Sequence, residues 1–401
     1  MLPYIFLIST VLLFSLICFN KSTKNNVYPQ VLKSVFLSVC FLLLFVYSAV
    51  RANIGYDYLM YHRGFLQMGA DGFASIAYLD WELGFTVLTK AIYLLTKNIH
   101  VYMAIIAAVC LAGPFYVIYR YSKAVWLSVL LYINLYFFYC TFNFLRQSIA
   151  ISIALFAYTA LINRKFWQYA ALIMFAALFH QTVLILLPVY FIVNFKPSLK
   201  IPLLYAYGVL WVFIASNATL DIIMDFIDSD YRQSVFLTKG LDYIHVVIPT
   251  LIIGCGIFFV LKCAKSKNND ADPDKIIIIQ TNLMYFSYFW ICVMLRHALF
   301  ERLSYYTYIY VILYIPEMLA FADEQYKKHL NKKFDFMLKN NELSEIQQQI
   351  IIARFKRRRN RLNVFLTLII IAVTLLYNIY GLAAYEKGVH GVYPYASWFK
   401  F

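Results

Sequence analysis

The sequence predicts an all-α, polytopic integral membrane protein, and three observations lead to this fold class. Hydrophobic residues make up 63% of the chain and charged residues only 14%, whereas soluble chains average about 45–50% and about 25%. The apolar residues form uninterrupted runs that are long enough for helices to cross a bilayer. Aromatic residues are abundant, with 35 Tyr and 35 Phe, and their rings suit both membrane interfaces and contact with sugars.

The apolar runs predict about twelve transmembrane helices, most of them about 17–25 residues long. The first run has no charged segment before it and no small-residue cleavage site after it, so we expect a retained span and not a signal peptide. The stretch 166–195 is broken at His180 and Gln181, and each half is short for a full crossing. In chain order, the expected spans are 2–19, 30–50, 99–119, 124–141, 145–162, 166–180, 181–195, 201–217, 244–262, 275–295, 299–320 and 362–381.

The segment 80–97 is only weakly apolar, because it carries Trp81, Glu82 and Lys90. We expect this segment to be re-entrant or to lie at the membrane surface. With that assignment, a single orientation puts most of the loop Lys and Arg residues on one side, which the positive-inside rule makes cytoplasmic. Both termini then lie outside.

The chain is expected to form a single transmembrane domain over residues 1–401, with two outer-face loops at 51–98 and 218–243. The one long polar segment, 321–361, is strongly basic and lies on the cytoplasmic side in this topology. Its simplest interpretation is a helix pair near anionic lipid, and binding of a cytoplasmic partner is the alternative. Nucleic-acid binding is not expected, because the basic cluster is short and tethered between two spans.

Several function classes are disfavoured. The chain has no Gly-rich phosphate loop and no Walker motif, which argues against a pump with its own ATPase. Its seven cysteines lie in apolar runs or at their ends without a CxxC motif, so neither a disulfide framework nor a zinc site is expected. The acidic residues lack the clustered spacing of metal ligands, and we expect no metal and no other cofactor.

Four clusters of charged and polar side chains fall on the expected outer side, where the positive-inside rule does not explain them. The first cluster holds Arg51 at a span end and Asp57 after a Gly-Tyr turn. Two tyrosines, Tyr58 and Tyr61, follow. A guanidinium and a carboxylate this close can hold a polar ligand between them, and a local ion pair is the alternative interpretation.

The second and third clusters lie in or beside apolar helices. Arg146 and Gln147 stand one turn inside an apolar run, where a charged Arg needs a carboxylate or phosphate partner unless it snorkels to the helix end. His180 lies at a break between two short apolar segments, where backbone must face protein or water instead of lipid. It is a candidate for function, and a structural hydrogen-bonding role is the alternative.

The fourth cluster lies at a span boundary and contains Arg296, His297, Glu301 and Arg302. A structural salt bridge within the helix is possible for Glu301, but it would leave a second arginine unpaired. Arginines that face one cavity favour phosphate or pyrophosphate, because each guanidinium pairs two oxygens and stays charged. The four clusters together therefore predict an anionic lipid-phosphate ligand, although they do not by themselves predict a reaction.

Five short motifs occur in order between about residues 45 and 320. They are R-x3-G-x-D-Y-x2-Y from Arg51, W-E-x-G-F at 81–85, N-x2-R-Q-x2-A from Asn143, F-H-x-T at 179–182, and E-R at Glu301–Arg302 followed by aromatic residues. With these motifs the chain resembles the Wzy/EpsG-like family of O-antigen and exopolysaccharide polymerases, in which the fourth motif more often has Ser than Thr. The basic segment 321–361 is not part of the resemblance.

The resemblance implies a fold similar to the GT-C class of membrane glycosyltransferases, in a bacterial cytoplasmic (inner) membrane with the active site facing outside. It implies that a growing glycan is transferred from undecaprenyl pyrophosphate onto a new lipid-linked repeat unit. Donor and acceptor are then undecaprenyl-pyrophosphate-linked oligosaccharides. Membrane lipids and a chain-length regulator protein are further candidate partners.

The candidate residues then take roles in such a transfer. Arg51, Arg146, Arg296 and Arg302 are expected to stabilise the leaving pyrophosphate in place of a metal. The candidates for the base that receives the acceptor proton are Asp57, His180 and Glu301, with Asp57 ranked first because it lies beside Arg51 and tyrosines. The expected sugar contacts are Tyr58, Tyr61 and Gln147.

Two rival functions remain open at this stage. An O-antigen ligase-like glycosyltransferase usually has a larger outer loop with its own Arg and His residues, whereas the loop 218–243 is modest and acidic. A flippase or other transporter of lipid-linked oligosaccharide should line a path through both leaflets with polar residues, whereas the unexplained charges here gather on one face. Both comparisons favour the polymerase.

Overall fold

The computed structural model describes nine stretches of the chain, and their regular elements are all helices. An isolated antiparallel bridge between Arg51 and Ser397 is the only strand-like pairing among these residues. The all-α fold class is confirmed. The described stretches are 1–19, 29–70, 81–195, 200–214, 244–265, 275–295, 300–340, 345–384 and 386–398.

The described helices follow the predicted apolar runs, but many of the runs are divided. The helices are α1 (Leu2–Phe19), α2 (Pro29–Ala49), α3 (Tyr58–Ala70), α5 (Leu83–Leu95), α6 (Ile99–Tyr121), α7 (Val125–Asn134), α8 (Phe137–Asn143), α9 (Leu145–Phe156), α10 (Tyr158–Ile162), α11 (Phe166–Ala177), η2 (Gln181–Ile185), α12 (Leu186–Ile192), α13 (Lys200–Ile214), α15 (Ile244–Lys265), α16 (Lys275–Val293), α17 (Phe300–Tyr308), α18 (Val311–Asn340), α19 (Glu345–Ala383) and η5 (Val389–Gly391).

Among the described residues, five helices are long and apolar enough to cross a membrane: α1, α2, α6, α16 and α19. The pair α7 and α8, bent by 48° at its break, counts as a sixth if it forms one span. Other expected spans are divided by breaks: 145–162 into the short helices α9 and α10, and 299–320 into the short α17 and the beginning of the 30-residue α18. Hydropathy measures the length of an apolar run, but it does not locate the residues at which the helix stops.

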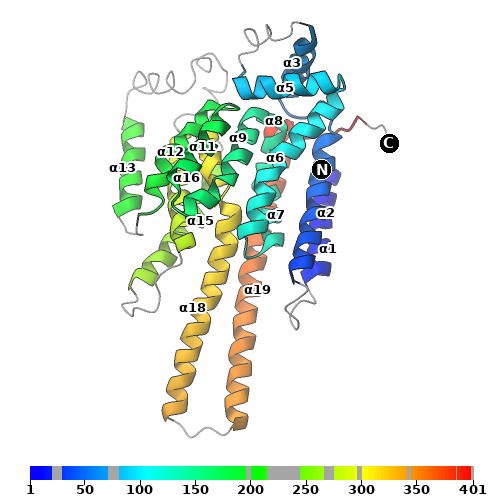
Figure 1. Ribbon diagram of the computed structural model, residues 1–401. Coiled ribbons are helices and arrows are strands. Elements are labelled where there is room, and N and C mark those ends of the chain that lie inside the picture. The colour runs from blue at the N-terminus through cyan, green and yellow to red at the C-terminus, as the bar shows by residue number, and fades with distance from the viewer. Residues whose placement is uncertain are drawn as a thin grey trace.

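The helices form a bundle from which one antiparallel pair projects (Figure 1). Helices α18 and α19 extend beyond the other helices at one end. An ion pair between Arg359 and Asp323, 3.1 Å apart, joins the two helices. They contain most of the basic segment 321–361, which is therefore mainly helical. Its cytoplasmic location stays a prediction.

Helices α3 and α5 lie at the opposite end of the bundle, which we call the α5 end (Figure 1). Helix α5 lies across the bundle and not along it. Its 13 residues rise about 20 Å, less than the roughly 30 Å of hydrocarbon in a bilayer. The re-entrant or interfacial location of 80–97 stays a prediction. The other expected outer loop, 218–243, lies outside the described residues.

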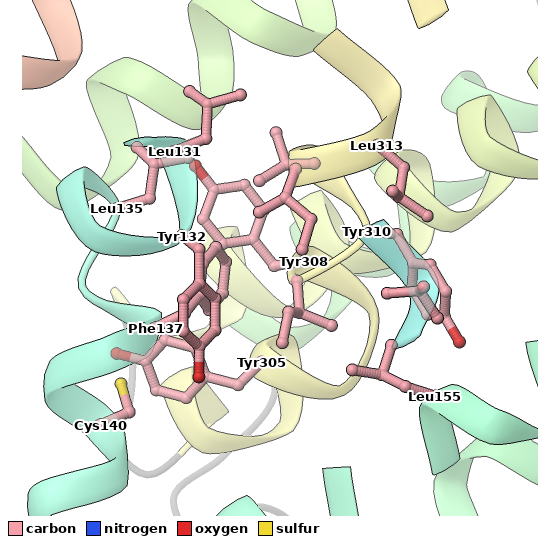
Figure 2. Close-up of a cluster of buried hydrophobic side chains, with 14 of the residues drawn as sticks. Leu131, Tyr132, Leu135, Phe137, Cys140, Leu155, Tyr305, Tyr308, Tyr310 and Leu313 are labelled. Carbon is pink, nitrogen blue, oxygen red and sulfur yellow. The ribbon is translucent and has the colours of Figure 1, made fainter. Parts of the chain in front are cut away.

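An aromatic core holds α8 against α17 (Figure 2). The ring of Phe137 lies 6.3 Å from that of Tyr305 and 6.4 Å from that of Tyr132, between centroids. Helix α8 begins after Tyr136, which has a left-handed φ of 69°. This conformation costs a non-glycine residue free energy, and here the ring is buried and its hydroxyl donates to the backbone oxygen of Tyr377. The packing therefore fixes the direction of α8, which leads to the candidate site.

Candidate functional site

The carboxylate of Glu82 joins two of the four clusters. Its Oε2 accepts a hydrogen bond from Nη1 of Arg146 at 2.6 Å, and its Oε1 lies 2.6 Å from Nδ1 of His180. The three side chains are largely withdrawn from solvent, with 11% exposure for Glu82, 24% for Arg146 and 16% for His180. The arginine inside an apolar helix thus has the carboxylate partner that its burial requires.

Two glycines explain how the W-E-x-G-F motif brings Glu82 to this place. The amide of Gly84 donates to the backbone oxygen of Leu178 at 2.7 Å, and a Cβ on Gly84 would lie 2.7 Å from that oxygen. Only glycine permits this approach of α5 to the end of α11, where His180 follows in extended backbone. On the other side, Trp81 packs so closely on Gly64 of α3 that a Cβ there would overlap the indole.

The Asp57 loop reaches the same site through α8. Gly55 has a φ of +95°, and a Cβ on it would lie 2.4 Å from the backbone oxygen of Phe142. Two residues later, the amide of Asp57 donates to Oδ1 of Asn143 at 3.0 Å. Burial raises the pKa of the Asp57 carboxyl above its usual value, although the nearby charges of Arg302 and Arg146 act to lower it.

Tyr61 lies one turn after Asp57 on α3, where the charge of the Arg146 guanidinium acts to lower the pKa of its hydroxyl. Its ring is 2% exposed and packs against Trp81 and Phe85. Burial raises the pKa of Tyr61 to about 12, so the hydroxyl stays protonated at neutral pH. Tyr61 thus connects the first sequence cluster to the second.

Gln147 and Arg302 add the fourth cluster to the site. The Gln147 amide donates from Nε2 to the backbone oxygen of Arg302 at 2.6 Å. The guanidinium carbon of Arg302 lies 4.4 Å from the ring centroid of Phe144, in a cation–π geometry. The structure therefore brings together three segments: the Asp57 loop, the Arg146 helix α9 and the Arg302 helix α17.

Glu301 lies at the edge of this arrangement. Its Oε1 accepts a hydrogen bond from the hydroxyl of Tyr305, one turn along α17, at 2.7 Å. The Tyr305 ring lies 6.4 Å from the ring of Phe144, and the Arg302 guanidinium lies over this same Phe144 ring. Arg296 and His297, the other members of this cluster, lie outside the described residues, so the role of Arg296 stays a prediction.

Arg51 is 1% exposed and packs among neutral groups. Its Nη1 donates to the backbone oxygen and the hydroxyl of Ser48 at 2.8 Å and 2.6 Å, and its guanidinium carbon lies 4.7 Å from the Phe142 ring centroid. Tyr58 is also buried, and its ring lies 6.2 Å from that of His62. These contacts favour a structural role for Arg51, and pyrophosphate and sugar binding by this pair stay predictions.

Sequence reasoning missed Glu82 as a site residue, although it stood in a quoted motif. The available signal was a single acid in the weakly apolar segment 80–97, where an unpaired carboxylate would be costly. Asn143 was likewise quoted without a role, and its contact with Asp57 depends on the turn between α8 and α9. Neither pairing is visible in the local pattern.

The arrangement supports proton transfer and anion binding. Burial acts to raise the pKa of Glu82, but the hydrogen bond from His180 and the charges of His180 and Arg146 outweigh it and hold the pKa below its usual value. An ionised carboxylate only accepts hydrogen bonds, so Nδ1 of His180 is the donor, and when the imidazole is neutral its Nε2 is left as a base or acceptor. Among the described residues, no group of three or more His, Cys, Asp and Glu has the geometry of a metal site.

One comparison with known proteins gives a match. The family model described as the EpsG family covers residues 34–338, which include every site residue discussed above. No curated protein and no solved structure matches the chain. The matched range ends inside α18, so it leaves out the rest of that helix, α19 and the C-terminal segment.

Proposed function

The chain belongs to the EpsG family, and from this premise we propose that it is a metal-independent glycosyltransferase that polymerises lipid-linked repeat units. Membership of the family supports a polysaccharide-polymerase type of function in general. The observation that carries the finer proposal is the buried contact of Glu82 with both Arg146 and His180, beside Asp57 and Arg302.

The reaction is a substitution at the anomeric carbon of the growing glycan. A hydroxyl of the new repeat unit forms a bond to this carbon, the bond from the carbon to the phosphate oxygen breaks, and undecaprenyl pyrophosphate leaves with the electron pair. The acceptor proton passes to a base. Each charge that develops needs a partner in the site, because the side chains of Glu82, Arg146 and His180 are largely withdrawn from solvent.

Arg146 and Arg302 are the groups that we assign to the leaving pyrophosphate. Both are cations near Asp57, so an incoming anion would compete with this carboxylate for them. Asp57 is the first candidate for the base, since burial raises its pKa and so its proton affinity. His180 is the second candidate, with Glu82 fixing its orientation and tautomer.

The proposal places the α5 end outside the bacterial cytoplasmic membrane and the helix pair α18 and α19 inside. Support comes from the positive-inside pattern, because the basic segment 321–361 lies on the projecting pair. Lipid-linked donor and acceptor would then reach the site from the outer leaflet. A chain-length regulator protein is a further proposed partner.

The test is the length distribution of surface polysaccharide on a gel after deletion of the gene. Deletion should reduce the ladder to a single added unit, wild type should restore it, and Arg146→Ala protein at normal abundance should not. The matched control is Lys123→Ala. Lys123 follows the C-terminal end of α6, its side chain is half exposed, and its Nζ lies 3.8 Å from Glu317. This variant should restore the full ladder.

The same gel separates the rival functions. Loss of a flippase stops all surface polymer, because no repeat unit reaches the outside, whereas loss of a polymerase leaves single units. Loss of a ligase leaves long polymer that stays on its lipid carrier. An unchanged ladder in the deletion strain would remove the polymerase proposal altogether.

A further inference from the structure

The C-terminal segment 386–398 returns to the α5 end of the bundle after α19 (Figure 1). The backbone amide of Ala52 donates to Ala396 at 3.1 Å, and that of Trp398 donates to Val50 at 3.1 Å, on either side of the bridge at Ser397. These bonds tie the segment to the chain that follows α2.

Side chains hold the segment at three further points. The hydroxyl of Tyr4 donates to the backbone oxygen of Val392 at 2.6 Å, and that of Tyr395 donates to Tyr47 at 2.8 Å. The ring of Trp398 stacks on His100 at 4.4 Å between centroids. The segment is therefore packed on the bundle over most of its length.

The turn η5 of this segment touches the Asp57 loop. The amide of Gly55 donates to the backbone oxygen of Gly391 at 3.0 Å. Gly391 has a φ of +69°, and a Cβ on it would lie 3.2 Å from the backbone nitrogen of Tyr56. The backbone two residues before Asp57 is thus supported by the C-terminal segment.

The other side of the same turn touches the Glu301 cluster through His390. Its ring meets that of Phe144 edge-on at 5.3 Å and that of Tyr305 at 6.4 Å, between centroids. Its Nε2 lies 3.3 Å from Sγ of Cys140, which is 7% exposed. His390 also has a left-handed φ of 57°, which a non-glycine residue keeps only where its surroundings hold it.

We propose that the C-terminal segment is a wall of the candidate site and that His390 is a positioning residue within it. Its ring holds Phe144 and Tyr305 in place. Phe144 contacts the guanidinium of Arg302, and the Tyr305 hydroxyl donates to Glu301. The residues matched by the family model end at 338, so this wall comes from outside them. The activity part rests on the proposed function, whereas the covering of Cys140 does not.

The first experiment measures the covering of Cys140 directly. A variant with Cys140 as its one cysteine is treated with a water-soluble maleimide in membranes that are open on both faces. Labelling should be slow with His390 present and several-fold faster in His390→Asn, which tolerates left-handed backbone but lacks the ring. His390→Phe keeps the ring contacts and should keep Cys140 protected.

The second experiment uses the polysaccharide gel with the same variants in the otherwise native chain. His390→Asn at normal protein abundance should shorten the ladder, and His390→Phe should restore it, because the ring contacts and not the imidazole nitrogens position the site. Lys387→Ala changes an exposed side chain of the same segment and should leave both readouts unchanged.

Three results would overturn the proposal. One is slow labelling of Cys140 in His390→Asn together with a full ladder. Another is labelling of Cys140 in His390→Phe that is as fast as in His390→Asn. The third is fast labelling with His390 present. If deletion of the gene leaves the ladder unchanged, the proposed function fails, but the labelling rates still decide whether the segment covers the site.

Discussion

Replacing Glu82 by glutamine tests the centre of the site with almost no change in volume. The carboxylate makes two charge-assisted contacts of 2.6 Å, to Arg146 and to His180, and all three groups are less than a third exposed. Hydrogen bonds to charged groups contribute about 1.5–3 kcal/mol each. The new amide is uncharged and accepts at one oxygen only, so Arg146 loses its ionic partner and at most one of the two contacts keeps its present direction.

The expected magnitude follows from this loss. Leaving a buried cation without its partner costs about 3–5 kcal/mol. Because the Arg146 side chain is 24% exposed and so keeps part of its hydration, we expect about 3 kcal/mol, the lower end of that range. If the activation free energy rises by this full amount, the rate falls on the order of 100-fold. The amide can also donate to Nδ1 of His180, which moves the proton to Nε2 and removes the base there.

The assay is incorporation of labelled lipid-linked repeat units into polymer by membranes with equal amounts of each variant. Glu317→Gln is the matched control, since this carboxylate lies 3.8 Å from the half-exposed Lys123 near the other end of α6. It should change the rate by less than about tenfold, because the contact described for Glu317 involves no residue of the candidate site. A wild-type rate for Glu82→Gln would refute the assignment of Glu82 to the site.

Three further predictions follow from the same geometry. Burial raises the pKa of Asp57 above 3.8, so the rate should fall on acidification at a pH above that value, as the base becomes protonated. The Asp57→Asn variant should have a low rate that lacks this fall at acidic pH. If the variant shows the same fall, another group is responsible for it. Gly84→Ala should abolish the ladder and lower the free energy of unfolding by about 1–3 kcal/mol in a thermal melt, because its Cβ would meet the backbone oxygen of Leu178. In the control Gly254→Ala the new Cβ meets nothing within 4 Å, so the ladder and the melt should stay unchanged. Polymerisation by washed membranes should persist in EDTA, and a loss that magnesium restores would contradict a metal-independent transfer.

The sequence predicted the contact partners of some of the charged residues better than those of others. Arg146 was expected to need an acidic or phosphate partner from its position inside an apolar run, and it has one. The partner itself was not identified, because Glu82 is 64 residues away and reaches Arg146 only where Gly84 lets α5 approach α11. Arg51 looked like an equal member of the anion site, but its neighbours are neutral groups.

The sequence by itself determined the membrane class, the all-helical architecture and the residue types of the site, because hydropathy and burial cost act on each segment separately. The tertiary structure alone decided which of these side chains meet. Helix breaks at Tyr136 and Phe144 direct α8 and α9, and the contact from Glu82 to His180 spans 98 residues. His390 comes from a turn 250 residues beyond Cys140. Such contacts depend on how whole helices pack, and no local pattern carries that information.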